Sequence, residues 1–212
     1  MNYTKTIRNY CLENKGRIFD VSYLKEHSFE MVPYKTLLKI LNRLVEEGIL
    51  SDVSKGIYLI NEEGVTLEAA VFNQYIAESR GMYAGYALYN QLGITSHKSD
   101  VIEIYTYLLS VPHKTIGPFK LTRLNLHFSE QTTSLVAMLE CLENCGKIED
   151  LEIDRFLNLT FEAPKFYSDL NFSWITQDRK YKRATVNSLS EILKNLGVKN
   201  DCLGIFERNA AK

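Results

Sequence analysis

The sequence lacks any long apolar segment. No apolar run approaches the ~20 residues that a helix needs to cross a bilayer, and the N-terminus MNYTKTIRNY lacks the apolar stretch of a secretory signal. Four cysteines in 212 residues do not suggest a disulfide framework. We therefore expect a cytoplasmic protein without a membrane segment.

Motifs of catalysis are also missing. The sequence has no nucleophile elbow, no P-loop and no dinucleotide fingerprint, because bulky residues separate the glycines of GMYAGYALYNQLG. Cys141 and Cys145 lie one helical turn apart, but a structural zinc site needs four ligands, and no second Cys/His pair has matching spacing. We predict no enzyme activity, no cofactor and no metal site, and an enzyme in the middle of the chain is the least supported alternative.

A strong excess of either charge is absent. The net charge is −1, but residues 1–60 carry nine Lys/Arg against seven Asp/Glu, residues 61–150 carry six against eleven, and residues 151–212 carry ten against eight. Two mildly basic ends therefore flank an acidic middle. This distribution permits a nucleic-acid contact at either end without requiring one.

The first 60 residues contain the pattern of a winged helix-turn-helix domain. Leucines at helical spacing in YKTLLKILNRLVEEG predict an amphipathic helix that begins at Pro33 and ends at Gly48. Two β-prone segments follow, separated by the turn at Ser54-Lys55-Gly56. The expected elements are a helix over 3–14, a strand at 17–19, helices over 21–27 and 33–47, and strands at 49–50 and 57–60.

The polar face of the third predicted helix is the candidate DNA-reading surface. Its first turn would reach base edges in a major groove, and the hairpin tip would reach a phosphate. The competing interpretation is a solvated helix face, which is the commonest role of such a stripe. The predicted DNA-binding residues are Tyr34, Lys35, Thr36, Lys39, Arg43 and Lys55.

The remainder of the chain predicts an α+β protein with three parts. We expect helices over 67–79 and 81–93, a strand at 101–109, one or two strands within 113–128, a helix over 132–145 and a helical tail broken at Pro164, with 163–172 as a candidate loop. The predicted domains are a winged helix-turn-helix domain at 1–62, a middle mixed α/β domain with a small antiparallel sheet at 65–146, and a helical C-terminal extension at 147–212.

The densest basic cluster of the chain lies in QDRKYKR. Such a cluster can contact phosphates as a secondary site, although a solvated loop or helix end is the favoured interpretation. Its cations are Arg179, Lys180, Lys182 and Arg183.

Two segments carry a resemblance to a known family. LLKILNRLVEEGILSDVSKGIYLI (37–60) is similar to the "ALSRLVKEG…RGIY" helix–wing signature of AbiEi-type antitoxins of bacterial type IV toxin–antitoxin (abortive infection) systems. MYAGYALYNQLGITSHKSDVIEIYT (82–106) is similar to the "G-ALNLLGLST…" helix of that family and the strand after it. Lys55 before Gly56 matches the basic residue before the wing glycine, whereas Asp52 departs from the more basic wing of many members. The resemblance covers roughly residues 1–145.

The resemblance implies a transcriptional autorepressor that binds an inverted repeat of double-stranded DNA in its own promoter, as a homodimer if the operator is symmetric. It also implies an antitoxin domain that neutralises a nucleotidyltransferase-type toxin. The residues leave two other functions open. One is a protein–protein adaptor whose winged helix does not bind DNA, and the other is a ligand-responsive regulator.

Overall fold

The computed structural model describes residues 2–210, which form eleven α-helices and two small sheets, one antiparallel and one mixed. This is the mixed α and β content expected from the sequence. The chain divides into two compact units, 1–77 with 115–117, and 78–114 with 118–212.

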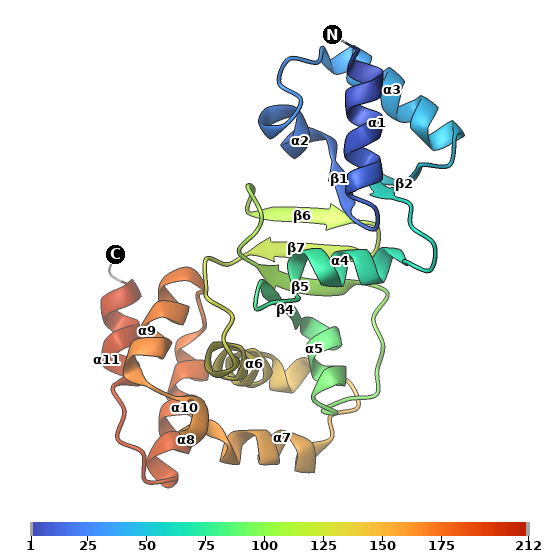
Figure 1. Cartoon of the computed structure of the whole chain (residues 1–212). Helices are drawn as coiled ribbons and strands as arrows, with labels where there is room; N and C mark the ends of the chain where they lie inside the picture. Colours follow the sequence, from blue (N-terminus) through green and yellow to red (C-terminus); the bar gives the residue numbers. More distant parts are fainter. Residues whose placement is uncertain (1, 211–212) are drawn as a thin grey trace. The chain divides into compact units, whose positions relative to one another are not determined.

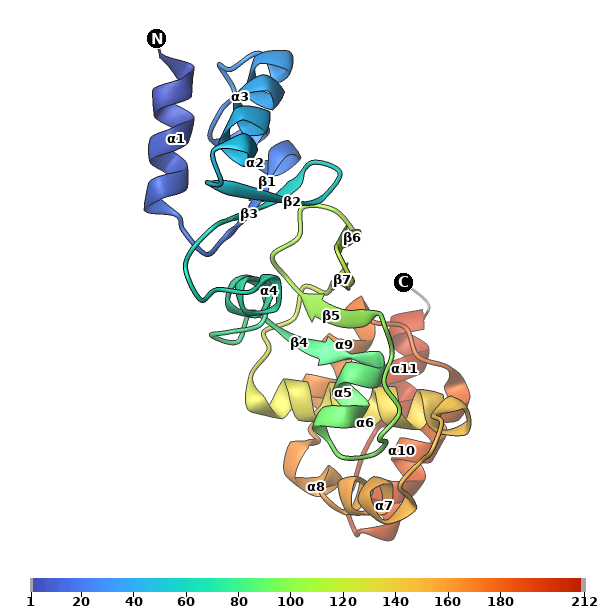
Figure 2. The same ribbon diagram turned by 90° about the vertical axis from the view of Figure 1, so that its right-hand side faces the viewer.

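The first unit combines four helices with a three-stranded antiparallel sheet in the order β1-β3-β2. Helices α1, α2 and α3 lie together on one side of this sheet and share one apolar core with it (Figure 2). Its elements are α1 (Tyr3–Glu13), β1 (Ile18–Asp20), α2 (Val21–His27), α3 (Tyr34–Glu46), β2 (Leu50–Ser54), β3 (Ile57–Ile60) and α4 (Leu67–Tyr75).

Local chemistry explains where these helices begin and end. The Asp20 carboxylate accepts hydrogen bonds from the backbone N–H groups at the start of α2, as an N-cap residue does. Pro33 precedes α3, where its missing N–H leaves no helical bond unmade. Gly48 follows α3 with a φ of +72°, a left-handed conformation that glycine adopts without a Cβ clash. Each boundary agrees with the sequence prediction to within about two residues.

Helix α4 belongs to the first unit. The backbone N–H of Ile18 in β1 donates a 3.0 Å hydrogen bond to the side-chain oxygen of Gln74 in α4. Ala70, Val71 and Tyr75 are buried on the inner face of the same helix. The first compact unit therefore continues to Ala77, beyond the border predicted at 62–65.

The second unit is built on a mixed sheet and a central helix. Strand β4 pairs antiparallel with β5, β5 pairs parallel with β7, and β6 completes the order β4-β5-β7-β6 (Figure 1). Its elements are β4 (Gly81–Ala84), α5 (Gly85–Gln91), β5 (Ile102–Thr106), β7 (Phe119–Arg123), α6 (Glu130–Asn144), α7 (Ile153–Phe161), α8 (Ala163–Phe166), α9 (Asp169–Asp178), α10 (Arg183–Asn195), α11 (Cys202–Ala210) and the first half of β6 (His113–Ile116), whose last two residues are assigned to the first unit.

Helix α6 is the centre of the second unit. All seven residues from Leu135 to Cys141 are buried. This part of the helix is therefore surrounded by protein on every face, whereas an amphipathic helix is buried along one face only. Its core includes Met82 and Leu88 from one side of the predicted border at 146, and Leu189 and Ile205 from the other. The C-terminal helices therefore share one core with the middle of the chain.

Three predictions were wrong. The sheet expected to be antiparallel in the middle of the chain is mixed, because β5 and β7 pair in parallel. Residues 81–84 form strand β4 instead of the start of a helix, because they pair with Glu103–Thr106 of β5, about 20 residues further along the chain. Residues 163–172, a candidate loop, contain α8 and the start of α9. Pro164 lies in the first turn of α8, where proline is well tolerated, so it begins a helix and does not end one.

Candidate nucleic-acid interface

The outer face of α3 carries a line of three cations. Leu37, Leu41 and Leu44 on the inner face are fully buried in the first unit. Lys35, Lys39 and Arg43 are exposed and recur every four residues, so they lie one above the other along the helix. We call these three residues the α3 cation stripe. The apolar face and the cationic face predicted from the sequence are thus both present.

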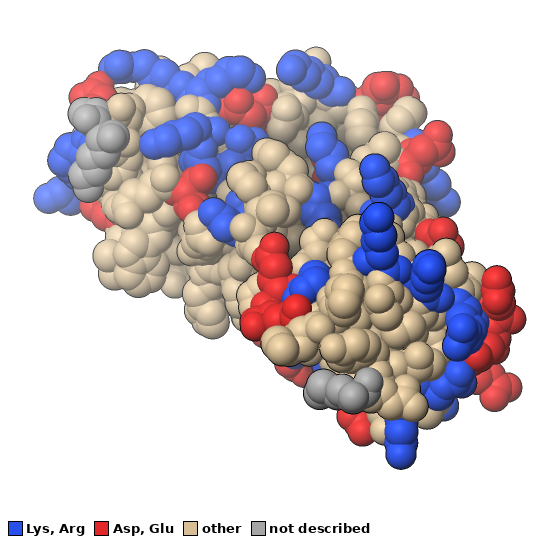
Figure 3. Space-filling view, turned by 90° about the horizontal axis from the view of Figure 1, so that it is seen from above, with Lys and Arg blue, Asp and Glu red and all other residues tan. Residues whose placement is uncertain are grey.

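Within residues 2–210 the α3 cation stripe has no direct ion-pair partner, although Arg43 acts electrostatically on the Glu47 carboxylate without pairing with it. Like charges four residues apart on a helix repel each other, at a cost of roughly 0.2–0.5 kcal/mol per pair. On the first unit, Figure 3 shows a band of Lys and Arg side chains with Asp and Glu side chains on either side of it. The stripe is therefore suited to an anionic partner.

A shallow depression of about 640 Å³ lies between the start of α1 and the outer face of α3. Lys39 and Arg43 line it together with Thr36 and the residues Asn2, Tyr3 and Thr4. The Asn2 side chain caps α1 by accepting a 3.2 Å hydrogen bond from the backbone N–H of Lys5. Backbone N–H groups at a helix start carry partial positive charge, which adds to that of the two cations. Sequence reasoning missed residues 2–4, because nothing local marks them as neighbours of α3.

The first turn of α3 presents the remaining residues of the predicted reading surface. Tyr34 is 53% exposed, and Thr36 is partly buried where it lines the depression. Tyr34 begins the helix directly after Pro33, so its position is set by the helix start. The structure therefore brings five of the six predicted DNA-binding residues onto one helix.

The sixth predicted residue, Lys55, lies at the tip of the β2–β3 hairpin and is exposed. The turn is closed by Gly56, whose φ is +75°. The backbone N–H of Val21 donates a 3.0 Å hydrogen bond to the Gly56 carbonyl, which fastens the tip to the start of α2. The hairpin is therefore short and held in place, and Lys55 extends from a fixed turn.

An ion pair joins α1 to the C-terminal end of α3. Arg8 and Glu47 approach to 2.6 Å, and their hydrogen bond holds the pKa of the Glu47 carboxyl below its usual value. Glu47 would be the next position of the α3 cation stripe after Arg43. Arg8 neutralises this carboxylate, so it also limits the negative charge at that end of the stripe.

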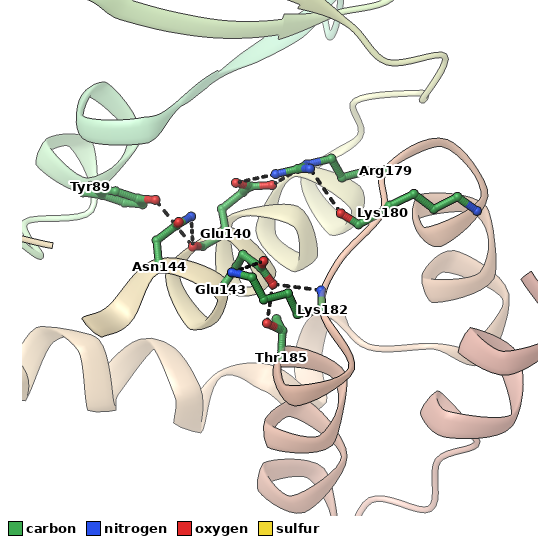
Figure 4. A network of polar contacts seen from close by, with 8 residues as sticks. All are labelled: Tyr89, Glu140, Glu143, Asn144, Arg179, Lys180, Lys182 and Thr185. Atoms are coloured by element: carbon green, nitrogen blue, oxygen red, sulfur yellow. Dashed lines mark hydrogen bonds and ion pairs between the residues drawn. The ribbon is translucent and has the colours of Figure 1, made fainter. Parts of the chain in front are cut away.

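The second basic cluster is engaged inside the second unit. The Arg179 guanidinium contacts both carboxylate oxygens of buried Glu140, at 3.0 and 3.4 Å (Figure 4). It also lies 5.1 Å from the centre of the Tyr181 ring. Lys182 pairs with Glu143 at 2.9 Å. Lys180 donates to the backbone carbonyl of Asn209 at 3.2 Å, and Arg183 pairs with Glu207 at 2.9 Å. All four cations therefore have internal partners, and we do not include them in the interface.

Glu143 acts as an N-terminal cap for α10 from a different helix. Its carboxylate accepts a 3.1 Å hydrogen bond from the backbone N–H of Lys182 and another from the Thr185 hydroxyl (Figure 4). Burial by itself raises the pKa of Glu143, but these hydrogen bonds and the Lys182 charge outweigh it, and the pKa is lowered. α10 has no side-chain cap of its own at Lys182, so the bond to α6 replaces one.

The two cysteines at the end of α6 differ in burial. Cys141 is buried, and burial raises the pKa of its thiol to about 12, whereas Cys145 is exposed. Within the described residues, no group of three or more His, Cys, Asp or Glu side chains could hold a metal ion. None of the helices in the described part of the chain is long and apolar enough to cross a membrane.

No protein-family description matches the chain, and no curated protein matches it either. The similarity of 37–60 and 82–106 to AbiEi-type antitoxins therefore stays a prediction.

The cap provided by Glu143 leads to a pH-dependent prediction. Replacement of Glu143 by Ala should destabilise the α6–α10 contact by about 1 kcal/mol at pH 7, the usual value of a lost N-cap. Because the folded-state pKa of Glu143 is lowered, its stabilisation is present above the unfolded pKa of about 4.3 and is lost as the pH falls through the folded value. Hydrogen exchange of the amides of residues 182–186, measured by mass spectrometry from pH 7 to about pH 3, checks both effects.

Glu191→Ala is the matched control, because Glu191 is an exposed α10 residue paired only with Lys194. It should leave this exchange nearly unchanged. Equal exchange in Glu143→Ala and the wild-type protein at pH 7 would contradict the proposed cap.

Proposed function

We propose that this protein is a sequence-specific DNA-binding regulator whose first unit is a winged helix-turn-helix domain. The order helix, strand, helix, helix, strand, strand from α1 to β3 supports this proposal, as does the antiparallel β1-β3-β2 sheet. In such a domain α3 is the recognition helix and the β2–β3 hairpin is the wing. Residues 28–33 connect α2 to α3 and begin with a turn at 28–31. This connection allows the polar face of α3 to point outward.

The α3 cation stripe is the observation on which the proposal depends. A helix rises about 1.5 Å per residue, so the stripe is about 12 Å long from position 35 to position 43. The major groove of DNA is about 12 Å wide and admits a helix of this kind. We assign Tyr34, Lys35 and Thr36 to base edges, because they form the first turn. We assign Lys39, Arg43 and the hairpin residue Lys55 to phosphates.

We also propose that the protein is a repressor of its own promoter and an antitoxin against a nucleotidyltransferase-type toxin. The resemblance of 37–60 and 82–106 to AbiEi-type antitoxins supports both roles. The operator is then an inverted repeat, bound by two copies of the chain. The second unit, which contains most of the antitoxin-like segment, carries the activity against the toxin.

A protein–protein adaptor is the second candidate, and helix α7 favours it. Ile153, Leu157 and Phe161 recur every four residues along α7 and are 64, 45 and 62% exposed. An exposed apolar row of this kind marks many protein interaction surfaces. Asp52, exposed on β2, and the net charge of −1 also favour this function.

The DNA-binding proposal predicts the effect of reversing one charge. Lys39→Glu should weaken binding to the upstream promoter DNA by at least about tenfold and reduce the salt dependence of the remaining binding, because one phosphate contact is replaced by repulsion. Its circular dichroism spectrum and melting temperature should match those of the wild-type protein, because Lys39 is exposed. Electrophoretic mobility shift at several salt concentrations measures the affinity.

Lys199→Glu provides the matched control, since it makes the same charge change at an exposed residue of the second unit. It should bind the promoter as the wild-type protein does. If Lys39→Glu and Lys199→Glu have equal affinities, α3 is not the DNA-binding element. If the wild-type protein shows no salt-sensitive binding at all, the adaptor function is favoured.

The antitoxin proposal predicts that a variant can lose DNA binding and still protect cells against the toxin. Full-length Lys39→Glu, expressed from an inducible promoter beside the neighbouring nucleotidyltransferase gene, should still protect cells, because Lys39 lies outside the second unit. Colony counts with and without induction measure protection, and immunoblotting verifies equal protein levels. Absence of protection by the wild-type protein would contradict the antitoxin role. Loss of protection only in Lys39→Glu would show that the antitoxin activity requires α3 and not the second unit alone.

A further inference from the structure

A second cavity lies entirely within the second unit. It has a volume of about 520 Å³, within the range of small-molecule sites, and lies between α9 and the segment from Asn125 to Thr132. One wall comes from Leu170, Trp174 and Gln177 of α9, and the other includes His127 and Gln131. No residue of the first unit lines it. A ligand in this cavity would therefore not contact the candidate DNA-binding residues.

Two large apolar side chains on the cavity wall are exposed to solvent. Trp174 is 56% exposed and Leu170 is 61% exposed, one helical turn apart on α9. Exposure of two such neighbours leaves apolar surface uncovered, which indicates a binding surface. Trp174 is also the only tryptophan of the chain. An indole ring offers a flat face on which another planar ring can stack.

Internal hydrogen bonds hold the polar wall of the cavity in place. Asp178 accepts hydrogen bonds from the backbone N–H of Asn125 and, at 3.1 Å, from its side-chain amide. The Asn171 side chain accepts a 3.1 Å hydrogen bond from the Thr132 hydroxyl and donates to the carbonyl of Gln131. These bonds join α9 to the opposite wall. The walls are therefore preorganised and do not need a ligand to bring them together.

Several polar groups on the walls remain able to bind a ligand. The side chain of Gln131 and the ring of His127 make no hydrogen bond to any other residue that the structure describes. Gln177 donates its amide N–H to the Ser173 hydroxyl at 3.3 Å, which leaves its carbonyl oxygen available. A side-chain amide can donate and accept in one plane, which matches the edge of a nucleobase.

The charges on the walls exclude most anionic ligands. No Lys or Arg lines the cavity, and Asp178 is its one acidic residue. A phosphate group or a nucleic-acid backbone is usually bound by several Lys or Arg side chains, and this cavity has none. The suitable ligand is therefore uncharged, has a flat ring and carries hydrogen-bonding groups on its edge.

We propose that this cavity binds a free nucleoside, with the base stacked on Trp174 and its edge hydrogen-bonded by the side-chain amides of Gln131 and Gln177. Stacking on an aromatic side chain and pairing with amides are the two interactions by which proteins bind unpaired bases. The absence of Lys and Arg from the cavity selects the nucleoside over its phosphorylated forms and over a single strand.

The single tryptophan allows a direct test on the full-length protein. Fluorescence excited selectively at tryptophan reports only on Trp174, so titration with adenosine, guanosine, cytidine, thymidine and uridine measures binding at this cavity. At least one nucleoside should give a saturable change, and its 5′-monophosphate should bind no more tightly. Gln131→Ala and Gln177→Ala should each weaken that binding by about three- to tenfold, since a neutral hydrogen bond contributes about 1 kcal/mol.

Gln91→Ala, the same substitution at an exposed residue outside the cavity, should bind like the wild-type protein. Trp174→Leu, followed by calorimetry because it lacks the fluorophore, should bind about tenfold more weakly or worse. Circular dichroism verifies that each variant is folded.

Three results would overturn the proposal. The first is no response to any nucleoside up to about 5 mM, beyond the weak end of small-ligand affinity. The second is binding of a short single-stranded oligonucleotide but of no nucleoside. The third is equal binding of neutral sugars such as glucose, which would show a site for polyols and not for bases.

Discussion

Burial of the leucine face of α3 is the interaction on which the candidate interface depends. Leu37, Leu41 and Leu44 are fully enclosed by the core of the first unit, and each contributes about 1.5–3 kcal/mol through removal from water. With this face fixed inward, the helical period leaves Lys35, Lys39 and Arg43 no position except the outer surface. The repulsion among these cations is small beside the burial of three leucines, so the fold can hold a stripe of cations without a direct ion-pair partner among residues 2–210.

The second unit uses its charges in the opposite way. Glu140 and Glu143 project from the central helix α6 toward the segment that joins α9 to α10, and their partners are Arg179 and Lys182. Glu140 is almost fully buried, so loss of Arg179 would leave a buried carboxylate unpaired, at a cost of several kcal/mol. Cations of this segment therefore stabilise the packing of α9 and α10 on α6. In the first unit, by contrast, the cations of α3 remain free for a partner.

Features encoded by neighbouring residues could be predicted from the sequence, and features that depend on distant residues could not. The apolar period of α3, its end at Gly48 and the turn at Gly56 are local, and the structure has all three. Strand β4 depends on pairing with β5 about 20 residues away, so the local sequence GMYA does not by itself indicate a strand. The segment QDRKYKR was equally ambiguous, because Glu140 and Glu143 lie about 40 residues before it.

The candidate sites show the same distinction. Five of the six predicted DNA-binding residues lie on one helix, and helical spacing was sufficient to group them. The depression beside them also needs residues 2–4, and the cavity at Trp174 needs two segments about 45 residues apart. Neither could be assembled from a linear pattern.

Amide chemical-shift mapping of the isotope-labelled full-length protein with its promoter DNA tests the central proposal most directly. If α3 enters the major groove, the largest shift changes fall on residues 34–43 of α3, with smaller ones at residues 2–4 and at Lys55. Tight promoter binding with the shift changes confined to the second unit, and none on α3, would contradict this proposal.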